Sequence, residues 1–144
     1  MSFTDFITDS GKKICIEHYI HLVQVSRIDG SISDQEMRML HREGRKFGLT
    51  DPEVDKIIKS ESNHQYIPPY SLKGKFDQIY NVAQIILADE QVTEAESKMI
   101  KRFAIEAGFR DEVIPKIIDL LMEGIKKGDD EDDLFERFRK EVLA

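Results

Sequence analysis

Two short acidic turns carry the residues of this sequence that could do chemistry. They read IDGSISDQE and ADEQVTEAE. In each turn an aspartate is followed seven residues later by a glutamate, which gives the candidate ligands Asp29, Glu36, Asp89 and Glu96. Carboxylates held close together repel one another, and a divalent cation relieves that repulsion. Oxygen ligands favour Ca²⁺, Mg²⁺ or Mn²⁺ over Zn²⁺. The turns therefore predict a metal site, provided that they converge in the fold.

The same turns also fit the start of a helix that needs no metal. Both have the capping-box pattern S/T-x-x-E, beginning at Ser33 and at Thr93. In a capping box the hydroxyl accepts a bond from a free backbone N–H, and the glutamate reaches back to the cap residue. An EF-hand loop is excluded, because its first and third ligand positions would fall on Val25 and Arg27. A cap alone, and a cap that also binds a cation, both remain open.

Helical spacing of apolar residues extends over nearly the whole chain. The predicted helices are 14–28, 34–48, 50–60, 72–88, 94–108, 111–128 and 129–144. Pro68 and Pro69 interrupt this pattern and predict an extended linker over residues 61–71. No alternation of period two is long enough to predict a strand. The predicted fold class is all-α, with seven or so helices in one domain, 1–144.

The two halves of the chain match without a gap when one is laid over the other. The identical pairs include Gln24/Gln84, Asp29/Asp89, Glu36/Glu96, Met39/Met99, Arg42/Arg102 and Gly48/Gly108. This alignment, here called the repeat register, predicts two three-helix repeats, at about 13–60 and 72–120, followed by a C-terminal helix at about 130–143. We expect a pseudo-two-fold axis between them, with helices 14–28 and 72–88 facing each other at the centre.

The first turn and its flanking helices resemble the TerB-like family, the tellurite-resistance group. That family's motif is A-D-G-x-(I/V)-x-x-x-E, often present twice; the first turn here lacks the alanine and the second lacks the glycine, which Glu90 replaces. The resemblance covers about residues 12–128. It implies a pseudo-symmetric helical domain, found also in the N-terminal region of the membrane-anchored co-chaperone DjlA. It further implies a metal-binding role for the four acids, and no catalytic activity.

Composition narrows the classes of partner. The 144 residues have a net charge of −7, which argues against a nucleic-acid partner because such binding depends on Lys and Arg. No apolar run approaches the length of a membrane span, and the N-terminus lacks a signal-peptide pattern, so we expect a cytoplasmic protein. The single cysteine, Cys15, stands in an apolar run and is expected to be buried.

Three further features have a structural and a functional interpretation. His18 and His21 have ligand spacing, but their counterparts Gln78 and Asn81 favour a polar helix edge. The aromatic residues near the prolines could form a recognition patch, although packing onto the bundle is the favoured interpretation; they are Tyr66, Tyr70 and Phe76. The apolar stripe of the last helix either docks on the core or meets a partner; it consists of Leu134, Phe135, Phe138 and Val142.

Two functions follow from the sequence. The first is a non-enzymatic, stress-associated module that binds a divalent cation at the acidic turns. The alternative is a metal-free helical domain that binds protein partners. No glycine-rich phosphate loop and no nucleophilic triad points to an enzyme.

Overall fold

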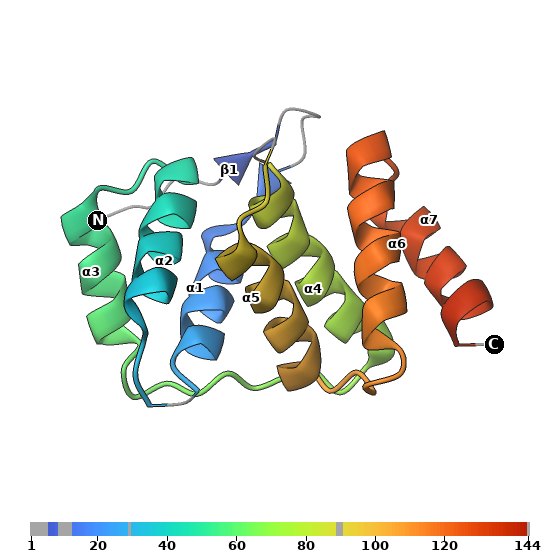
Figure 1. Ribbon diagram of the computed structural model, residues 1–144, viewed down its shortest axis with the longest axis horizontal. Coiled ribbons are helices and arrows are strands. Elements are labelled where there is room, and N and C mark those ends of the chain that lie inside the picture. The colour runs from blue at the N-terminus through green and yellow to red at the C-terminus, as the bar shows by residue number, and fades with distance from the viewer. Residues whose placement is uncertain (1–5, 9–12, 29, 89–90, 144) are drawn as a thin grey trace.

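Seven α-helices make up most of the described part of the chain (Figure 1). The computed structural model describes residues 6–8, 13–28, 30–88 and 91–143, and it is 68% helical. The helices are α1 (Ile16–Ser26), α2 (Asp34–Lys46), α3 (Asp51–Ser60), α4 (Leu72–Leu87), α5 (Glu94–Glu106), α6 (Ile114–Lys127) and α7 (Glu131–Arg137), and a π-helical segment, η1 (Phe138–Val142), extends α7. The all-α prediction is confirmed.

Two predictions about the N-terminal segment are wrong. Strands β1 (Phe6–Ile7) and β2 (Lys13–Ile14) form a small antiparallel pair, which is too short to leave an alternating pattern in the sequence. Cys15 is exposed rather than buried. It is the residue between β2 and α1, at the cap position of the helix, so its side chain does not join the apolar face that begins with Tyr19.

The repeat register reappears in the local structure of the two halves. Helices α2 and α5 begin at matching positions of the register and also end at matching positions. After each helix the chain turns at a glycine with positive φ, 78° at Gly48 and 96° at Gly108. Only glycine adopts this conformation at little cost. The next residue, Leu49 or Phe109, donates its N–H to a carbonyl five residues earlier in both copies.

Helices α1 and α4 pack against each other, as predicted from the repeat register. Their inward faces are fully buried, with Tyr19 and Leu22 from α1 and Phe76 and Ile79 from α4 among the buried residues. Helix α5 contacts α1, α2 and α4, so it joins the second half of the chain to the first. Helices α3 and α7 lie at opposite ends of the molecule (Figure 1).

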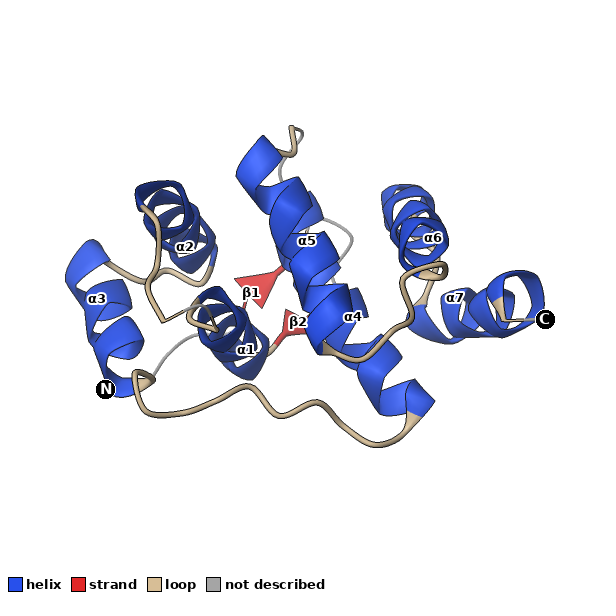
Figure 2. Cartoon of the chain, turned by 60° about the horizontal axis from the view of Figure 1, so that its bottom comes forward, coloured by secondary structure: helices blue, strands red, loops and turns tan. Residues whose placement is uncertain are grey.

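The proline-containing linker runs as an extended loop from α3 to α4 (Figure 2). Its aromatic residues divide between core and surface. Tyr66 is buried and packs against Phe103, with ring centroids 5.1 Å apart. Tyr70 is fully exposed, at 104% of its reference area. The favoured interpretation, that the linker packs on the bundle, therefore holds for Tyr66 and not for Tyr70.

The C-terminal helix docks on the core. Leu134 and Phe138 have no exposed area. Close approach to α6 depends on Gly124, because a Cβ atom at that position would overlap the Leu134 side chain. None of the helices in the described ranges is long and apolar enough to cross a membrane.

Candidate functional site

Both acidic turns form complete capping boxes, which confirms that part of the sequence interpretation. At the start of α2, Ser33 Oγ accepts the N–H of Glu36 at 3.1 Å, and Glu36 Oε1 accepts the N–H of Ser33 at 3.1 Å. At the start of α5, Thr93 and Glu96 make the same two bonds at 3.1 and 2.8 Å. Each glutamate is thereby held at the first turn of its helix.

Each of these glutamates also meets an arginine from the other half of the chain. Arg102 Nη1 on α5 donates to Glu36 Oε2 at 2.8 Å. Arg42 Nη2 on α2 lies 3.9 Å from Glu96 Oε1 and donates to the Gln91 carbonyl at 3.3 Å. Arg42 and Arg102 occupy matching positions in the repeat register. The arginine of each helix thus meets the glutamate of the other helix. A pseudo-two-fold axis between the halves requires such a reciprocal pair of contacts.

The four predicted metal ligands fall only partly within the described residues. Asp29 and Asp89 lie outside them, as does Glu90. Glu36 and Glu96 are each fixed by a cap and approached by a cationic side chain of the protein itself. Within the described ranges, no group of three or more His, Cys, Asp or Glu side chains is arranged to hold a metal ion. The cation site stays a prediction.

The two turns are not equivalent in their surroundings. The Glu36 side chain keeps 22% of its exposed area, whereas the Glu96 side chain has none. Glu96 is covered by residues of α2: Glu43, which is also fully buried, and Lys46, which is 9% exposed. The Lys46 ammonium lies 2.5 Å from Glu43 Oε2 and 3.9 Å from Glu96 Oε2. Two buried carboxyl groups and one buried amine therefore meet at the contact between the halves.

Burial separates the protonation states of the two carboxyl groups. Burial, with the neighbouring Glu96, raises the pKa of Glu43 to about 9, although Lys46 opposes the shift. Burial alone would raise the pKa of Glu96 too, but interactions with Glu43, the Thr93 N–H, Lys46 and Arg42 lower it overall. At neutral pH Glu43 therefore keeps its proton while Glu96 carries a negative charge.

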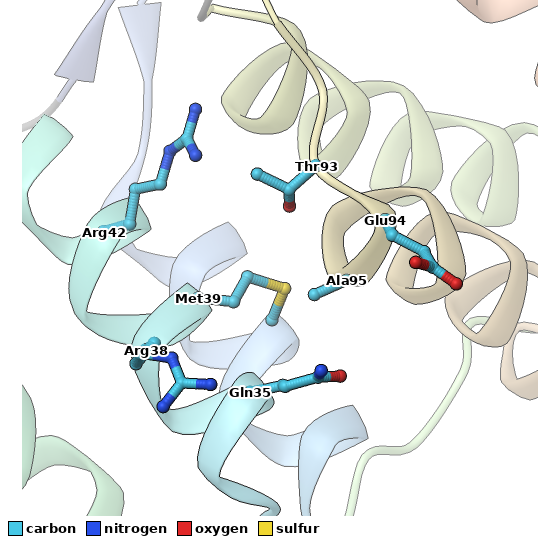
Figure 3. Close-up of a pocket in the computed structure, with 7 residues that line it drawn as sticks. All are labelled: Gln35, Arg38, Met39, Arg42, Thr93, Glu94 and Ala95. Carbon is cyan, nitrogen blue, oxygen red and sulfur yellow. The ribbon is translucent and has the colours of Figure 1, made fainter.

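Two small hollows flank the line where α2 meets α5. One has a volume of about 290 Å³ and is lined from α2 by Arg38, Met39 and Arg42 (Figure 3). Met39 points across this hollow toward Ala95 of α5. The other has a volume of about 340 Å³ and is lined by Lys98, Met99 and Arg102, which match those three α2 residues in the repeat register. The two hollows are thus related to each other as the two halves of the chain are.

Comparisons with protein-family models, curated proteins and solved structures find no match to this chain. The TerB-like resemblance therefore remains a hypothesis that rests on the two turns and their register.

The histidines of α1 form an aromatic contact. The rings of His18 and His21 meet edge to face, with centroids 5.8 Å apart, and His21 also packs against Tyr66 at 5.8 Å. Burial lowers the pKa of both imidazoles, for His21 with a further lowering by His18. Both side chains are partly buried, and the buried Nδ1 atom of each ring has no hydrogen-bond partner among the described residues, which differs from a polar helix edge.

A different histidine binds two carboxylates between α2 and α3. His41 Nδ1 lies 2.9 Å from Asp51 Oδ1, and Nε2 lies 2.9 Å from Asp55 Oδ1. Arg45 reaches the same Asp51 carboxylate at 3.1 Å. The hydrogen bond from His41, aided by Arg45, lowers the pKa of Asp51. These contacts tie the two helices together at their exposed edge.

Sequence reasoning missed Glu43 and Lys46. A signal for them exists in the repeat. Glu43 stands on the apolar stripe of α2, three residues after Leu40, and its counterpart in the second half is Phe103. When an acidic residue matches a buried phenylalanine of the other repeat, its side chain is expected to be buried, either as a charged carboxylate or as a neutral carboxylic acid.

Proposed function

We propose that this chain is a non-enzymatic helical domain that binds a protein partner without needing a metal ion. The observation that carries the proposal is the exposure of residues 67–70 of the linker, here called the strap. Its sequence is Ile-Pro-Pro-Tyr. Ile67 is 81% exposed and Tyr70 is 104% exposed. Large apolar side chains exposed together are a feature of protein interaction sites.

The strap is held at both ends, which favours binding. Before it, Tyr66 is buried and donates its hydroxyl hydrogen to Gln78 of α4. After it, Ser71 caps α4 by accepting the N–H of Gly74 at 3.0 Å. The two prolines restrict the backbone to an extended, polyproline-like conformation. A partner with an apolar, aromatic-lined groove could bind such a segment at a small entropic cost.

A binding comparison tests this proposal. The purified protein is used as bait, and partners are quantified for the wild type and for Ile67→Ser/Tyr70→Ser. We expect the double variant to lose the bound partner. Ile7→Ser is the matched control, because Ile7 is also exposed, at 65%, but lies on β1. Retention of the same partner by the strap variant, or its loss on adding a chelator, would contradict the proposal.

A second proposal keeps the stress-associated, cation-binding module. It is favoured by one observation: the Glu36 carboxylate is partly exposed and lines a hollow of about 340 Å³. Asp29, seven residues earlier, would have to supply further oxygens, with Ca²⁺, Mg²⁺ or Mn²⁺ as the bound ion. Resistance to tellurite and other stresses would then depend on the loaded form.

Calorimetric titration of each metal into the wild type and into Asp29→Asn/Asp89→Asn tests the second proposal. We expect saturable binding to the wild type and a raised melting temperature, because a ligand of the folded state stabilises it by mass action. The double variant should bind more weakly. Absence of heat and of any thermal shift at millimolar metal would rule the cation out.

A further inference from the structure

The ammonium group of Lys46 is enclosed by oxygen atoms from three helices. Glu43 Oε2 of α2 and the Ile85 carbonyl oxygen of α4 each lie 2.5 Å from Nζ, and Glu96 Oε2 of α5 lies 3.9 Å away. The Lys46 side chain is 9% exposed, and both glutamate side chains are fully buried. An ion pair at this depth is costly unless the charged group is well surrounded by oppositely charged or polar atoms.

The oxygen atoms around Lys46 Nζ could also surround a cation other than an ammonium group. Ile85 belongs to the last turn of α4, where the carbonyl ends of a helix carry partial negative charge. Apart from the contact between the two carboxyl groups themselves, both oxygens of Glu43 and Glu96 Oε2 are buried and accept no hydrogen bond from the described residues; Glu43 Oε2 meets Lys46 only as an ion-pair contact. An ammonium group donates three hydrogen bonds, and the lining offers it two oxygens at 2.5 Å and a third, from a charged carboxylate, at 3.9 Å. Such a lining of buried oxygens suits a cation.

We infer that Lys46 occupies a cation-binding site built by α2, α4 and α5, and that its tethered ammonium takes the place of a free metal ion beside Glu96. The wild type consequently binds no exogenous cation at the second turn. Truncation of Lys46 opens the site to small cations, either alkylammonium ions or divalent metals. This inference is independent of the strap and of its partner.

The Glu36 turn has no such lysine beside it. In the repeat register the counterparts of Glu43 and Lys46 are Phe103 and Glu106. Glu106 lines a different cavity, of about 580 Å³, together with Gln24. A buried lysine is therefore a property of the second turn only. At the first turn the protein's own cation is Arg102, and the Glu36 side chain stays partly exposed, so a free cation, if one binds, belongs there.

Thermal unfolding of Lys46→Ala tests the inference. Propylammonium chloride, CaCl₂ and MnCl₂ are titrated separately, with NaCl at equal ionic strength as the reference. We expect a saturable rise in melting temperature for Lys46→Ala with at least one of these cations. The control is Lys101→Ala, which removes an exposed lysine of α5. It should show no saturable rise. Adding Glu96→Gln to Lys46→Ala should abolish the effect, because it removes the charged carboxylate of the site, and glutamine keeps the capping box of α5.

Two results would overturn the inference. One is a Lys46→Ala protein that folds but responds to every cation as the Lys101→Ala control does. The other concerns the wild type and remains decisive if Lys46→Ala does not fold. In a ¹⁵N-lysine NMR spectrum the Lys46 ammonium should exchange hydrogen more slowly than exposed lysines, with its signal assigned by loss in Lys46→Met. Uniformly fast exchange of all lysine ammonium groups would show that Nζ is not enclosed.

Discussion

The ion pair between Glu36 of α2 and Arg102 of α5 joins the two halves of the chain, and its contribution to the free energy of unfolding can be measured. Glu36→Gln removes the charge that Arg102 Nη1 meets at 2.8 Å. Glutamine is accepted at this position of a capping box, so the start of α2 is preserved. Arg102→Gln removes the other partner. The free energies of unfolding of the wild type, both single variants and the double variant together give the coupling energy.

The expected coupling follows from exposure and distance. Both side chains are mostly buried, with 22% and 23% of their area exposed. Fully exposed pairs contribute about 0.2–1 kcal/mol, and hydrogen bonds to charged groups about 1.5–3 kcal/mol. A partly buried, 2.8 Å pair lies between these ranges. We therefore expect a coupling of about 1–2 kcal/mol between Glu36 and Arg102.

Urea unfolding followed by circular dichroism measures this coupling, with and without EDTA. The matched control is Lys98 with Glu94 on α5, an ion pair at 3.4 Å whose side chains are 72% and 84% exposed. Its coupling should be about 0.3–0.5 kcal/mol. A Glu36–Arg102 coupling no larger than the control would refute the reasoning. A coupling that falls on adding EDTA would show that a bound metal contributes to it.

Three further predictions concern packing and pH. Phe138→Ala should lower the free energy of unfolding in urea by about 3–5 kcal/mol, because its fully buried ring packs against other phenylalanines. Leu143→Ala, at a position 41% exposed, should change it by no more than about 0.5 kcal/mol. Glu43 has a folded-state pKa raised to about 9 from 4.5, so the folded protein holds a proton that the unfolded chain loses between these values. Its contribution to stability should therefore fall as the pH rises through this window, and urea unfolding of Glu43→Gln should lack that component. The pKa of Asp51 is lowered by the bond from His41, so its contribution is present above about pH 4 and is lost as the pH falls further. Asp51→Asn should lose less stability in acid than the wild type, and equal acid sensitivity would contradict that pairing.

The fold was largely predictable from the sequence because local signals and the repeat agree. Apolar spacing and the caps at Ser33 and Thr93 predicted where α2 and α5 begin, and placed their ends within about half a turn. The repeat register predicted that their turns would match. The β1–β2 pair was not predictable, since such short strands carry no period. The exposure of Tyr70 depends on which side of the linker faces the bundle, and spacing alone does not determine that.

The candidate site was predictable in part only. The capping role of Glu36 and Glu96 is local, so the sequence pattern predicted it. Their arginine partners, Arg102 and Arg42, come in each case from the other half of the chain. Such pairs depend on how α2 lies against α5. Glu43 was missed because a search for apolar spacing treats an acidic residue among the buried positions of a helix as a break in the apolar pattern.

The two acidic turns differ in the residues that surround their glutamates, and this difference affects where a cation could bind. Both copies keep the cap and the reciprocal arginine, which are the features that hold α2 and α5 together. They differ at the positions of Glu43 and Lys46, which close the second turn with an internal cation. A duplicated, symmetric metal site would need equivalent surroundings at both glutamates. The structure instead provides one turn whose glutamate is fully buried beside Arg42 and Lys46, and one whose glutamate is paired with Arg102 and partly exposed. If Lys46 takes the place of a free cation at the second turn, as we infer, the metal titration should find its site at the partly exposed Glu36 turn.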